Sequence, residues 1–400
     1  MPSRRSVLAG LLASGAVGLG SRVRLDRFEP TAVPSDTWPR PRYDHRNTAR
    51  APVTVPSAPG VAWRTEARGT GDAVGLVVGR ERVFVGTAHV HAFDRVDGTE
   101  RWSAIGVGGR CALGTDHLYV SESQSGSESP RLRAFDREGT VQWDVELRPA
   151  DSVLPLSSGV LTSALGGALR AFGTDGRSRA GTRHGGHGSL AVAAGTLYGA
   201  GPYAVQRYQR PTVADATVGR FPDSQWTSDL NAARTTLTVH DGALLVGNRQ
   251  STVAVEAFDL EAGQRRWRVA PTPGDDEVSA TRAPVVVDGT AVTATAVETG
   301  SDRRTWRLLG VDAASGERRW RRPLDSAVRD VAAGEEAVLL ATGHDRMEQT
   351  GIPRGSVRAF DVTGAPQWRT TFDVPVRTLA LADGTVFALL ADGSVAALRA

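Results

Sequence analysis

The sequence predicts an all-β fold, a β-propeller of eight four-stranded antiparallel blades, and three observations lead to this prediction. A short phrase recurs along the chain, and its fullest copy is Ala257-Phe258-Asp259 followed by Gly263 and Trp267. The Phe positions of neighbouring copies are ~40 to 50 residues apart, which is the blade period of a propeller. Each end of the chain carries the part of the phrase that the other end lacks, so we expect the final blade to be built from both ends.

The phrase has four further full copies and one weaker copy. The full copies are Ala92-Phe93-Asp94 with Gly98 and Trp102, Ala134-Phe135-Asp136 with Gly139 and Trp143, Gly310-Val311-Asp312 with Gly316 and Trp320, and Ala359-Phe360-Asp361 with Gly364 and Trp368. The weaker copy, Ala171-Phe172-Gly173 with Gly176 and Ala180, lacks the Trp. We expect the Ala position to be small because the neighbouring blade approaches closely, and the Phe to fill the core between sheets. The Asp and Gly should turn the chain into the last strand, from which the Trp reaches the adjacent blade.

The two ends of the chain predict how the ring closes. Ala397-Leu398 begins the phrase near the C-terminus, and Val61-Ala62-Trp63-Arg64 finishes it near the N-terminus. We therefore expect the strand around Trp63 to be the outermost strand of the last blade. Closure of this kind removes open sheet edges, which otherwise promote aggregation.

Counting the copies gives eight units. They are residues 73–107, 110–148, 151–183, 187–228, 235–271, 280–324, 328–373, and 376–400 completed by 60–66. Hairpin turns are predicted at Asp116-His117, Ser158-Gly159, Asp241-Gly242, Asp288-Gly289 and Asp383-Gly384, since Gly accepts positive φ. The fourth unit is degenerate, because Tyr208 stands at the Phe position and Gln209 to Asp223 is inserted before Trp226. Seven blades therefore remain an alternative.

Two segments precede the predicted propeller at 58–400. Residues 1–21 carry Ser3-Arg4-Arg5-Ser6-Val7-Leu8, which resembles a twin-arginine export signature, and an apolar run to Gly20. This run is short for the ~30 Å hydrocarbon core of a membrane, so we interpret it as a signal peptide, with a buried helix or an uncleaved anchor as alternatives. Residues 22–57 contain many prolines and are interpreted as a linker and lead-in segment. The predicted location is extracytoplasmic, in the cell envelope or secreted.

Composition narrows the classes of function. The formal net charge of +3 does not suggest a nucleic-acid-binding protein, for which a clustered basic face is expected. Cys111 is the only cysteine, so the chain can form neither an intrachain disulfide nor a cysteine-based metal site. We expect a monomer with no membrane span beyond the signal segment.

The repeated phrase resembles the tryptophan-docking motif of the PQQ-like quinoprotein propellers. The pattern Ala-x-Asp-x-x-x-Gly-x-x-x-Trp occurs at 257–267 and 92–102, and residues 38–48 resemble the lead-in of exported prokaryotic members. The resemblance covers about residues 38–400. It implies the propeller fold and one of two roles: a quinone-dependent alcohol or sugar dehydrogenase, or a cofactor-free binding scaffold similar to the propeller lipoprotein of the β-barrel assembly machinery.

The features of the dehydrogenase branch are not matched in this sequence. Many of those enzymes place a vicinal Cys-Cys ring beside the quinone, which one cysteine cannot form. No motif matches their Glu, Asn and Asp around calcium or their catalytic Asp. We therefore predict no catalytic, cofactor or metal residues and a non-catalytic scaffold. A PQQ-dependent dehydrogenase with calcium, or a hydrolase built on the propeller loops, remains an alternative.

The longer connections between strands predict where a partner binds. They are Ser121–Pro130, Gly181–Ser189, Pro271–Ser279, Thr299–Arg304 and Gly343–Gly355. All of them should project from one face, because they join second to third strands or successive blades. Insertions gathered on one face of a repeat array typically mark its binding side. The exception is Gln209–Asp223, which should lie on the opposite face. The expected partner is a protein or another envelope component.

Several local clusters have a functional and a plainer interpretation. His184-Gly185-Gly186-His187 is a metal site or an ordinary loop, Asp275-Asp276-Glu277 a calcium site or a solvated acidic loop, and Asp345-Arg346-Met347-Glu348 a surface ion-pair segment. Arg265-Arg266-Trp267-Arg268 and Arg318-Arg319-Trp320-Arg321-Arg322 bind an acidic partner or block edge pairing by their charge. His89 and His91 are ligands or a channel-facing or solvated pair. The plainer interpretation is favoured for each.

Overall fold

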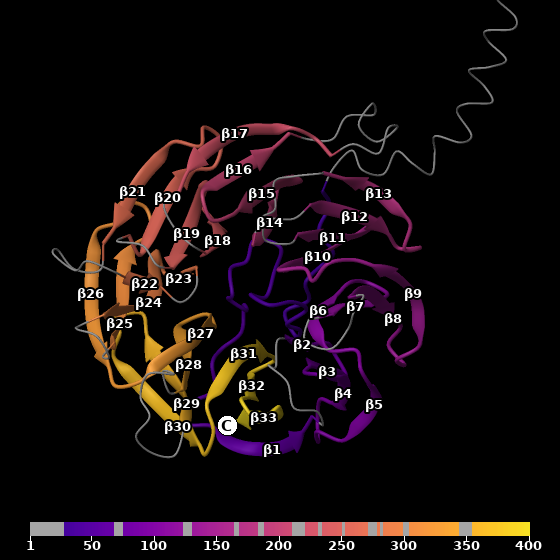
Figure 1. Cartoon of the computed structure of the whole chain (residues 1–400). Coiled ribbons are helices and arrows are strands. Elements are labelled where there is room, and N and C mark those ends of the chain that lie inside the picture. The colour runs from indigo at the N-terminus through magenta and orange to yellow at the C-terminus, as the bar shows by residue number, and fades with distance from the viewer. Residues whose placement is uncertain are drawn as a thin grey trace, which may run out of the picture.

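The computed structural model contains eight β-sheets arranged around a central axis as a closed ring (Figure 1). It describes residues 28–67, 75–122, 130–163, 168–182, 188–209, 221–230, 234–249, 253–270, 278–280, 283–298, 304–343 and 354–400. The eight-bladed propeller is confirmed, and the seven-bladed alternative is wrong because the degenerate fourth unit forms a full sheet of its own.

The blades are numbered along the chain, and in each of them the strands run antiparallel from the axis outward. Blade 1 consists of β2 (Gly75–Val78), β3 (Arg82–Gly86), β4 (Val90–Asp94) and β5 (Glu100–Ala104), and blade 2 of β6 (Gly109–Leu113), β7 (Leu118–Glu122), β8 (Arg131–Phe135) and β9 (Val141–Glu146). Blade 3 consists of β10 (Ser152–Leu156), β11 (Gly159–Ser163), β12 (Leu169–Gly173) and β13 (Ser178–Gly181), and blade 4 of β14 (Ser189–Ala193), β15 (Thr196–Ala200), β16 (Ala204–Tyr208) and β17 (Ser224–Asp229).

The second half of the ring repeats this arrangement. Blade 5 consists of β18 (Arg234–His240), β19 (Ala243–Arg249), β20 (Val255–Asp259) and β21 (Arg265–Val269), and blade 6 of β22 (Val278–Ala280), β23 (Val285–Val287), β24 (Thr290–Glu298), β25 (Arg304–Asp312) and β26 (Arg318–Leu324). Blade 7 consists of β27 (Ala327–Ala333), β28 (Ala337–Gly343), β29 (Gly355–Asp361) and β30 (Pro366–Phe372), and blade 8 of β31 (Val376–Ala382), β32 (Thr385–Leu390), β33 (Ser394–Arg399) and β1 (Gly60–Glu66). In blade 6 the innermost position is shared by two short strands, β22 and β23, which both pair with β24.

The last blade joins the two ends of the described chain, as the sequence predicts. Strand β1 pairs antiparallel with β33, and Trp63 lies opposite Ala397. Figure 1 shows the indigo β1 beside the yellow β33 at the C-terminus. The Arg64 side chain adds ion pairs to Asp373 at 2.9 Å and Asp392 at 2.7 Å. These contacts hold β1 on blade 8, so the outer edge of β33 is paired.

Six indoles around the ring dock on the next blade. Trp102 of blade 1 donates its Nε1–H to the carbonyl of Arg137 at 2.9 Å, and its ring packs against Phe135 of blade 2. The ring also covers Gly139, where a Cβ atom would lie 2.6 Å from Trp102 Cδ2. The same indole-on-glycine contact occurs at Trp63–Gly98, Trp143–Gly176, Trp226–Gly263, Trp267–Gly316 and Trp320–Gly364. The glycine therefore supplies positive φ and also the space for the indole.

In one copy of the phrase the first residue is a glycine, and the adjacent strand requires it to be small. At Gly310, a Cβ atom would lie 2.2 Å from the ring of Trp320. Trp320 lies opposite Gly310 on β26 of the same blade. At this position the indole of the adjacent strand therefore leaves no room for a larger side chain.

Tight turns join the inner pairs of strands. Asp241 and Gly242, Asp288 and Gly289, and Asp383 and Gly384 all have positive φ, as expected for two-residue hairpins of type I′. Blade 4 uses Ala194 and Gly195 in the same way. In blade 3 the turn is one residue earlier than predicted, because Leu156 pairs with Gly159.

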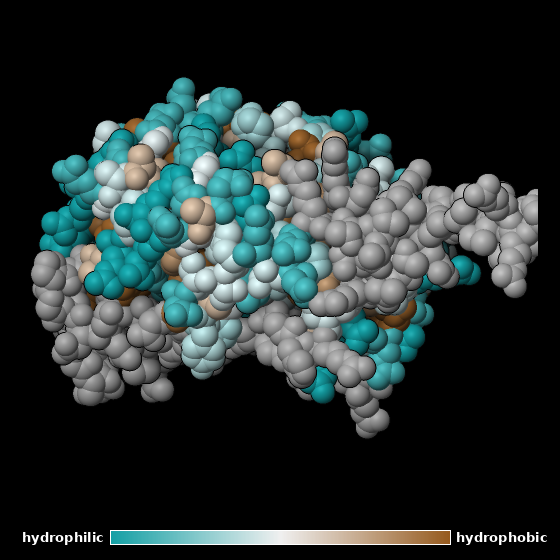
Figure 2. Space-filling view, turned by 90° about the horizontal axis from the view of Figure 1, so that it is seen from above, coloured by the Kyte–Doolittle hydropathy of each residue, from teal (hydrophilic) through white to brown (hydrophobic). Residues whose placement is uncertain are grey.

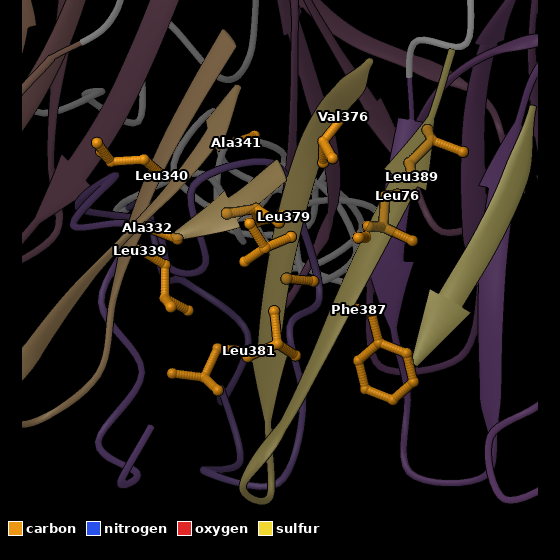
Figure 3. Close-up of a cluster of buried hydrophobic side chains, with 14 of the residues drawn as sticks. Leu76, Ala332, Leu339, Leu340, Ala341, Val376, Leu379, Leu381, Phe387 and Leu389 are labelled. Carbon is orange, nitrogen blue, oxygen red and sulfur yellow. The ribbon is translucent and has the colours of Figure 1, made fainter. Parts of the chain in front are cut away.

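The largest apolar cluster links blades 6, 7, 8 and 1 and includes Trp38 from the segment that precedes β1. Its buried members include Leu339, Leu379, Phe387 and Leu76, which come from β28, β31, β32 and β2 (Figure 3). The inner strands are therefore apolar on both faces, since each face packs against a neighbouring blade.

The predicted signal peptide at residues 1–21 lies outside the described residues. Among the residues that are described, none belongs to a helix that is long and apolar enough to cross a membrane.

Candidate functional site

The two faces of the ring differ in which strands they connect. One face carries the turns between first and second strands and between third and fourth strands, and we call it the plug face. The other, the loop face, carries the connections between second and third strands and between blades. Because strands alternate in direction, the inner strands of all blades end on the plug face.

Residues 28–59 cross the middle of the ring on the plug face, and we call this segment the plug (Figure 1). The plug pairs with the ends of the inner strands, where backbone groups would otherwise be unpaired. Its backbone hydrogen bonds include Trp38 N to Val78 O at 2.7 Å, Leu113 N to Pro39 O at 2.6 Å, Val192 N to His45 O at 2.7 Å, Val239 N to Arg46 O at 2.9 Å and Ala51 N to Ala333 O at 3.0 Å. With Ser157 N to Glu29 O and Arg42 Nη2 to Pro284 O, the plug contacts blades 1 to 7.

Buried polar side chains fix the plug in place. Arg42 donates from Nε to Asn47 O and from Nη2 to Thr238 Oγ1, each at 3.0 Å. His45 donates from Nε2 to Pro155 O at 2.7 Å. Burial, and then the charge of Arg40, lower the pKa of His45 to about 3, so this imidazole is neutral at physiological pH. The plug is therefore a specific part of the fold and crosses the middle of the ring on this face.

The loop face has a rim of buried polar pairs at the strand ends. In blade 2, Glu122 accepts from Arg133 Nε at 2.7 Å, and in blade 5, Glu256 accepts from Asn248 Nδ2 at 3.0 Å and Arg265 Nη1 at 3.1 Å. Both carboxylates are buried, so their partners are needed to compensate for lost hydration. These pairs hold the strand ends from which the longer connections leave.

Two large apolar side chains stand out from the loop face. Ile105, in the connection from blade 1 to blade 2, is 81% exposed, and Tyr203, between β15 and β16, is 79% exposed. Figure 2 shows the ring from its edge, where the coloured surface is mostly hydrophilic with scattered apolar residues. Ile105 and Tyr203 are apolar contacts available to a partner on the loop face, and exposed aromatic side chains such as Tyr203 often anchor protein interfaces.

The two histidines at the start of β4 contact other groups of blade 1 and its connection to blade 2. His91 is buried, lies 2.8 Å through Nδ1 from Glu100 Oε1, and stacks on Phe93. His89 accepts a hydrogen bond at Nδ1 from the backbone N–H of Gly106 at 2.9 Å. Across the described ranges, no group of three or more His, Cys, Asp or Glu side chains could hold a metal ion.

The arginine runs of the outer strands make ion pairs within their own blades. Arg266 lies 2.7 Å from Asp259, and Arg319 lies 2.6 Å from Asp312. Backbone N–H groups of each turn, and then the arginine, lower the pKa of Asp259 and of Asp312 to about 2. This placement on β21 and β26 agrees with the interpretation that the charges protect outer strands.

Other predicted elements of the site fall where the structure describes little. These predicted elements are His184 to His187, Asp275-Asp276-Glu277 and Asp345 to Glu348, and all three lie outside the described residues. So do most of the longer connections, including the inside of Gln209–Asp223. The strands on either side of these connections are described. Three of them, β7, β19 and β28, are second strands of their blades and end on the loop face.

The sequence did not indicate a cavity of about 520 Å³ on the plug face. It lies between the plug and the turns of blades 1 and 2. Its walls come from segments far apart in the chain, and no local motif marks such a place.

A closed ring of eight four-stranded blades, joined by indoles that dock on turn glycines, defines the class of PQQ-like β-propellers. The family model described as outer membrane protein assembly factor BamB matches residues 56–186 and 166–344. These matches cover more than half of the chain, so the chain belongs to this family of propellers. No curated protein sequence matches the chain.

Several solved structures share the fold at low identity. BamB from Moraxella catarrhalis is 15% identical with a TM-score of 0.61, over 86% of this chain and 100% of that one. The quinohemoprotein alcohol dehydrogenase ADHIIG from Pseudomonas putida HK5 is 12% identical with a TM-score of 0.65, over 91% and 80%. Sqt1 from Saccharomyces cerevisiae is 9% identical with a TM-score of 0.62, over 86% and 99%. Proteins of quite different function share this ring, so the structural similarity shows the fold and does not show the function.

Proposed function

We propose that this protein is an exported, non-catalytic scaffold that binds a protein or another envelope component through its loop face. Membership of the family supports a role outside the cytoplasm, because the family model carries the description of an outer membrane protein assembly factor. The twin-arginine-like sequence at Ser3 to Leu8 supports export.

The observation that carries the proposal is the difference between the two faces. The plug fills the middle of one face and hydrogen-bonds to the ends of the inner strands. The other face presents Ile105 and Tyr203 above a rim of fixed strand ends. It also receives the longer connections of the sequence. A rim of hydrogen-bonded strand ends that carries longer connections suits the binding of a partner.

The proposal is tested by placing a photo-crosslinking amino acid at single positions of the full chain in the producing organism. Tyr203 and Ile105 report on the loop face, whereas exposed Thr115 on the plug face and exposed Gln142 on β9 serve as controls. We expect one discrete adduct from both loop-face positions and none from the controls. An adduct that forms equally from all four positions, or from none, contradicts binding through this face.

Export is tested separately by changing Arg4 and Arg5 together to Lys. Twin-arginine transport depends on both arginines, so we expect the double variant to remain in the cytoplasm while the unchanged protein is found in the envelope or the medium. Cell fractionation measures this. An unchanged distribution would contradict the twin-arginine route and would leave the binding face unaffected.

A catalytic role would appear in a direct assay of the purified protein. The protein is mixed with PQQ and calcium, and absorbance and dye reduction are recorded with alcohols and sugars. We expect no stoichiometric uptake and no turnover. Uptake together with substrate-dependent dye reduction would replace the scaffold by a quinoprotein dehydrogenase.

A further inference from the structure

The cavity on the plug face has the size and the mixed lining of a small-molecule site. Its volume of about 520 Å³ lies within the range of ~300–1,000 Å³ that is usual for ligand pockets. The plug contributes Pro34 and Pro39, blade 1 contributes Arg82 and Phe84, and blade 2 contributes Leu113 and Arg137. Apolar surface therefore lies beside two guanidinium groups.

Backbone hydrogen bonds hold the walls of this cavity in position. Trp38 and Val78 exchange two bonds, at 2.7 and 2.8 Å, and Leu113 N donates to Pro39 O at 2.6 Å. Arg95, which is buried, donates from Nη1 to Asp36 O at 2.7 Å and so fixes the plug to blade 1. A ligand would enter a preformed site and would lose little affinity to ordering of the protein.

Arg82 is less than fully compensated by the protein. Its side chain is 23% exposed, and its buried Nη1 has no hydrogen-bond partner among the described atoms. The nearest carboxylate is Glu138, at 3.6 Å and itself 70% exposed, which makes a weak, hydrated ion pair. Nη1 itself is closed off from the cavity, but its missing hydrogen bond leaves the positive charge of a guanidinium that lines the cavity poorly compensated, so an anion in the cavity would be favoured.

Arg137 brings a second positive charge to the same cavity. Its Nη2 donates to the carbonyls of Gly114 at 2.8 Å and Thr115 at 3.0 Å, which orients the guanidinium. Burial lowers the pKa of Arg137, and the charge of Arg82 contributes to the same direction against the opposing effect of Asp116. Of the other lining residues, Arg80 and Glu81 carry opposite charges, so the lining as a whole holds three arginines and one glutamate.

We propose that this cavity binds a small organic anion, whose carboxylate or phosphate is held by Arg82 and Arg137 and whose apolar body packs on Pro34, Pro39 and Phe84. Planar guanidinium groups suit both oxyanions, because they can donate two parallel hydrogen bonds. The site lies on the face opposite the one assigned to the partner, so it adds a second binding activity to the scaffold.

Titration calorimetry of the full chain tests the proposal with four probes. Phenylacetate and phenyl phosphate carry both the anion and the apolar body, phenylacetamide lacks the charge, and inorganic phosphate lacks the apolar body. We expect one of the two aryl anions to bind with a stoichiometry of one, at least about tenfold more tightly than either control probe. The better aryl anion identifies the headgroup. Equal affinity for phenylacetamide, equal affinity for inorganic phosphate, or no heat with any probe would overturn the proposal.

Two arginine variants connect the binding to this cavity. Arg82→Gln removes a charge that makes no hydrogen bond to described residues, so its melting temperature should stay unchanged while the dissociation constant rises about tenfold. Arg137→Gln should weaken binding similarly, although it also loses two bonds to the blade 2 turn. Arg177→Gln on blade 3, whose parent side chain is 82% exposed, is the control and should bind within about twofold of the unchanged protein. Unchanged affinity in folded Arg82→Gln places any binding elsewhere and refutes this site.

Discussion

At the residue scale, the contact between an indole and a turn glycine recurs around most of the ring. Gly316 has φ of +75°, and Trp267 from the preceding blade lies where its Cβ would be, at 2.6 Å. Gly106 has the same φ of +75° and no atom within 4 Å of its added Cβ. Comparing Gly316 with Gly106 separates the need for positive φ, which both positions share, from the need for space beside an indole, which only Gly316 has.

We expect Gly106→Ala to cost about 1–2 kcal/mol of unfolding free energy, since a side chain disfavours positive φ. Gly316→Ala should cost a further ~1–3 kcal/mol because the indole must move. Urea denaturation of both variants measures the difference. Equal losses of unfolding free energy in the two variants would mean that the indole of Trp267 makes room for the added methyl group at no cost.

The indole N–H provides a second comparison. Trp320 donates to Val362 O at 2.8 Å, whereas the buried Nε1 of Trp368 has no hydrogen-bond partner among the described atoms. Both residues occupy the same place in the phrase, so replacement by Phe removes similar apolar surface. We expect Trp320→Phe to lose about 0.5–1.5 kcal/mol more than Trp368→Phe in denaturant unfolding. A larger loss of unfolding free energy for Trp368→Phe would show that the indole hydrogen bond does not decide which of the two tryptophans stabilises the protein more.

At the scale of elements, the plug makes stability depend on pH through His45. Its pKa of about 3 in the folded protein lies below the value of about 6.5 for an unfolded chain. The unfolded state therefore takes up the proton first, and stability falls as the pH drops from about 6.5 toward 3. The slope from this one group reaches at most ~1.4 kcal/mol per pH unit.

A His45→Gln variant tests this dependence. The Gln amide can still donate to Pro155 O but does not titrate, so the variant should lose less stability than the unchanged protein between pH 6.5 and 4. Urea denaturation at pH 7, 6, 5 and 4 gives both slopes, and titrating carboxylates contribute to both alike. Parallel slopes would mean that the imidazole is protonated without penalty in the folded state.

The strand that closes the ring is tested by truncation. Removing residues 1–67 deletes the plug and β1, which leaves the outer edge of β33 and the ends of the inner strands without partners. We expect this product to form soluble aggregates and to melt earlier and less cooperatively. Removing only residues 1–27 keeps every described contact and serves as the control. Size-exclusion chromatography and calorimetry report both properties, and a monomer with an unchanged melt would contradict the closed ring.

At the scale of the whole molecule, Cys111 reports whether the ring unfolds as one unit. Cys111 is fully buried between blades 1 and 2, and burial raises the pKa of its thiol to about 12. A thiol-specific disulfide reagent at pH 8 should therefore react only after opening. If opening is global, Gly316→Ala in the distant blade 6 speeds labelling about tenfold for each 1.4 kcal/mol of lost stability. Unchanged labelling would mean that blades open independently.

The fold could be predicted from the sequence because most blades place similar residues at the same spacing, and this spacing repeats along the chain. Ala257, Phe258 and Trp267 show this spacing, and the degenerate copy with Tyr208 still forms a blade. The closure by Trp63 follows from the same phrase, divided between the two ends.

The plug and the cavity could not be predicted in this way. The bonds of Trp38 to Val78, of Pro39 to Leu113 and of His45 to Val192 join segments that share no local pattern. The prolines of the lead-in exclude regular elements but do not show where an irregular chain lies. Likewise, Arg82 and Arg137 become neighbours only because two blades pack together. Single exposed residues such as Tyr203 carry no periodic signal at all.

The pairing of β1 with β33 has a consequence for synthesis. A ribosome makes β1 before β33, yet the partners of β1 lie at Ser394–Arg399. Strand β1 must therefore wait without its partner while the intervening blades are made, and the ring closes only in a late folding step. A chain that stops before Ser394 lacks the strand on which β1 pairs, and its eighth blade remains incomplete.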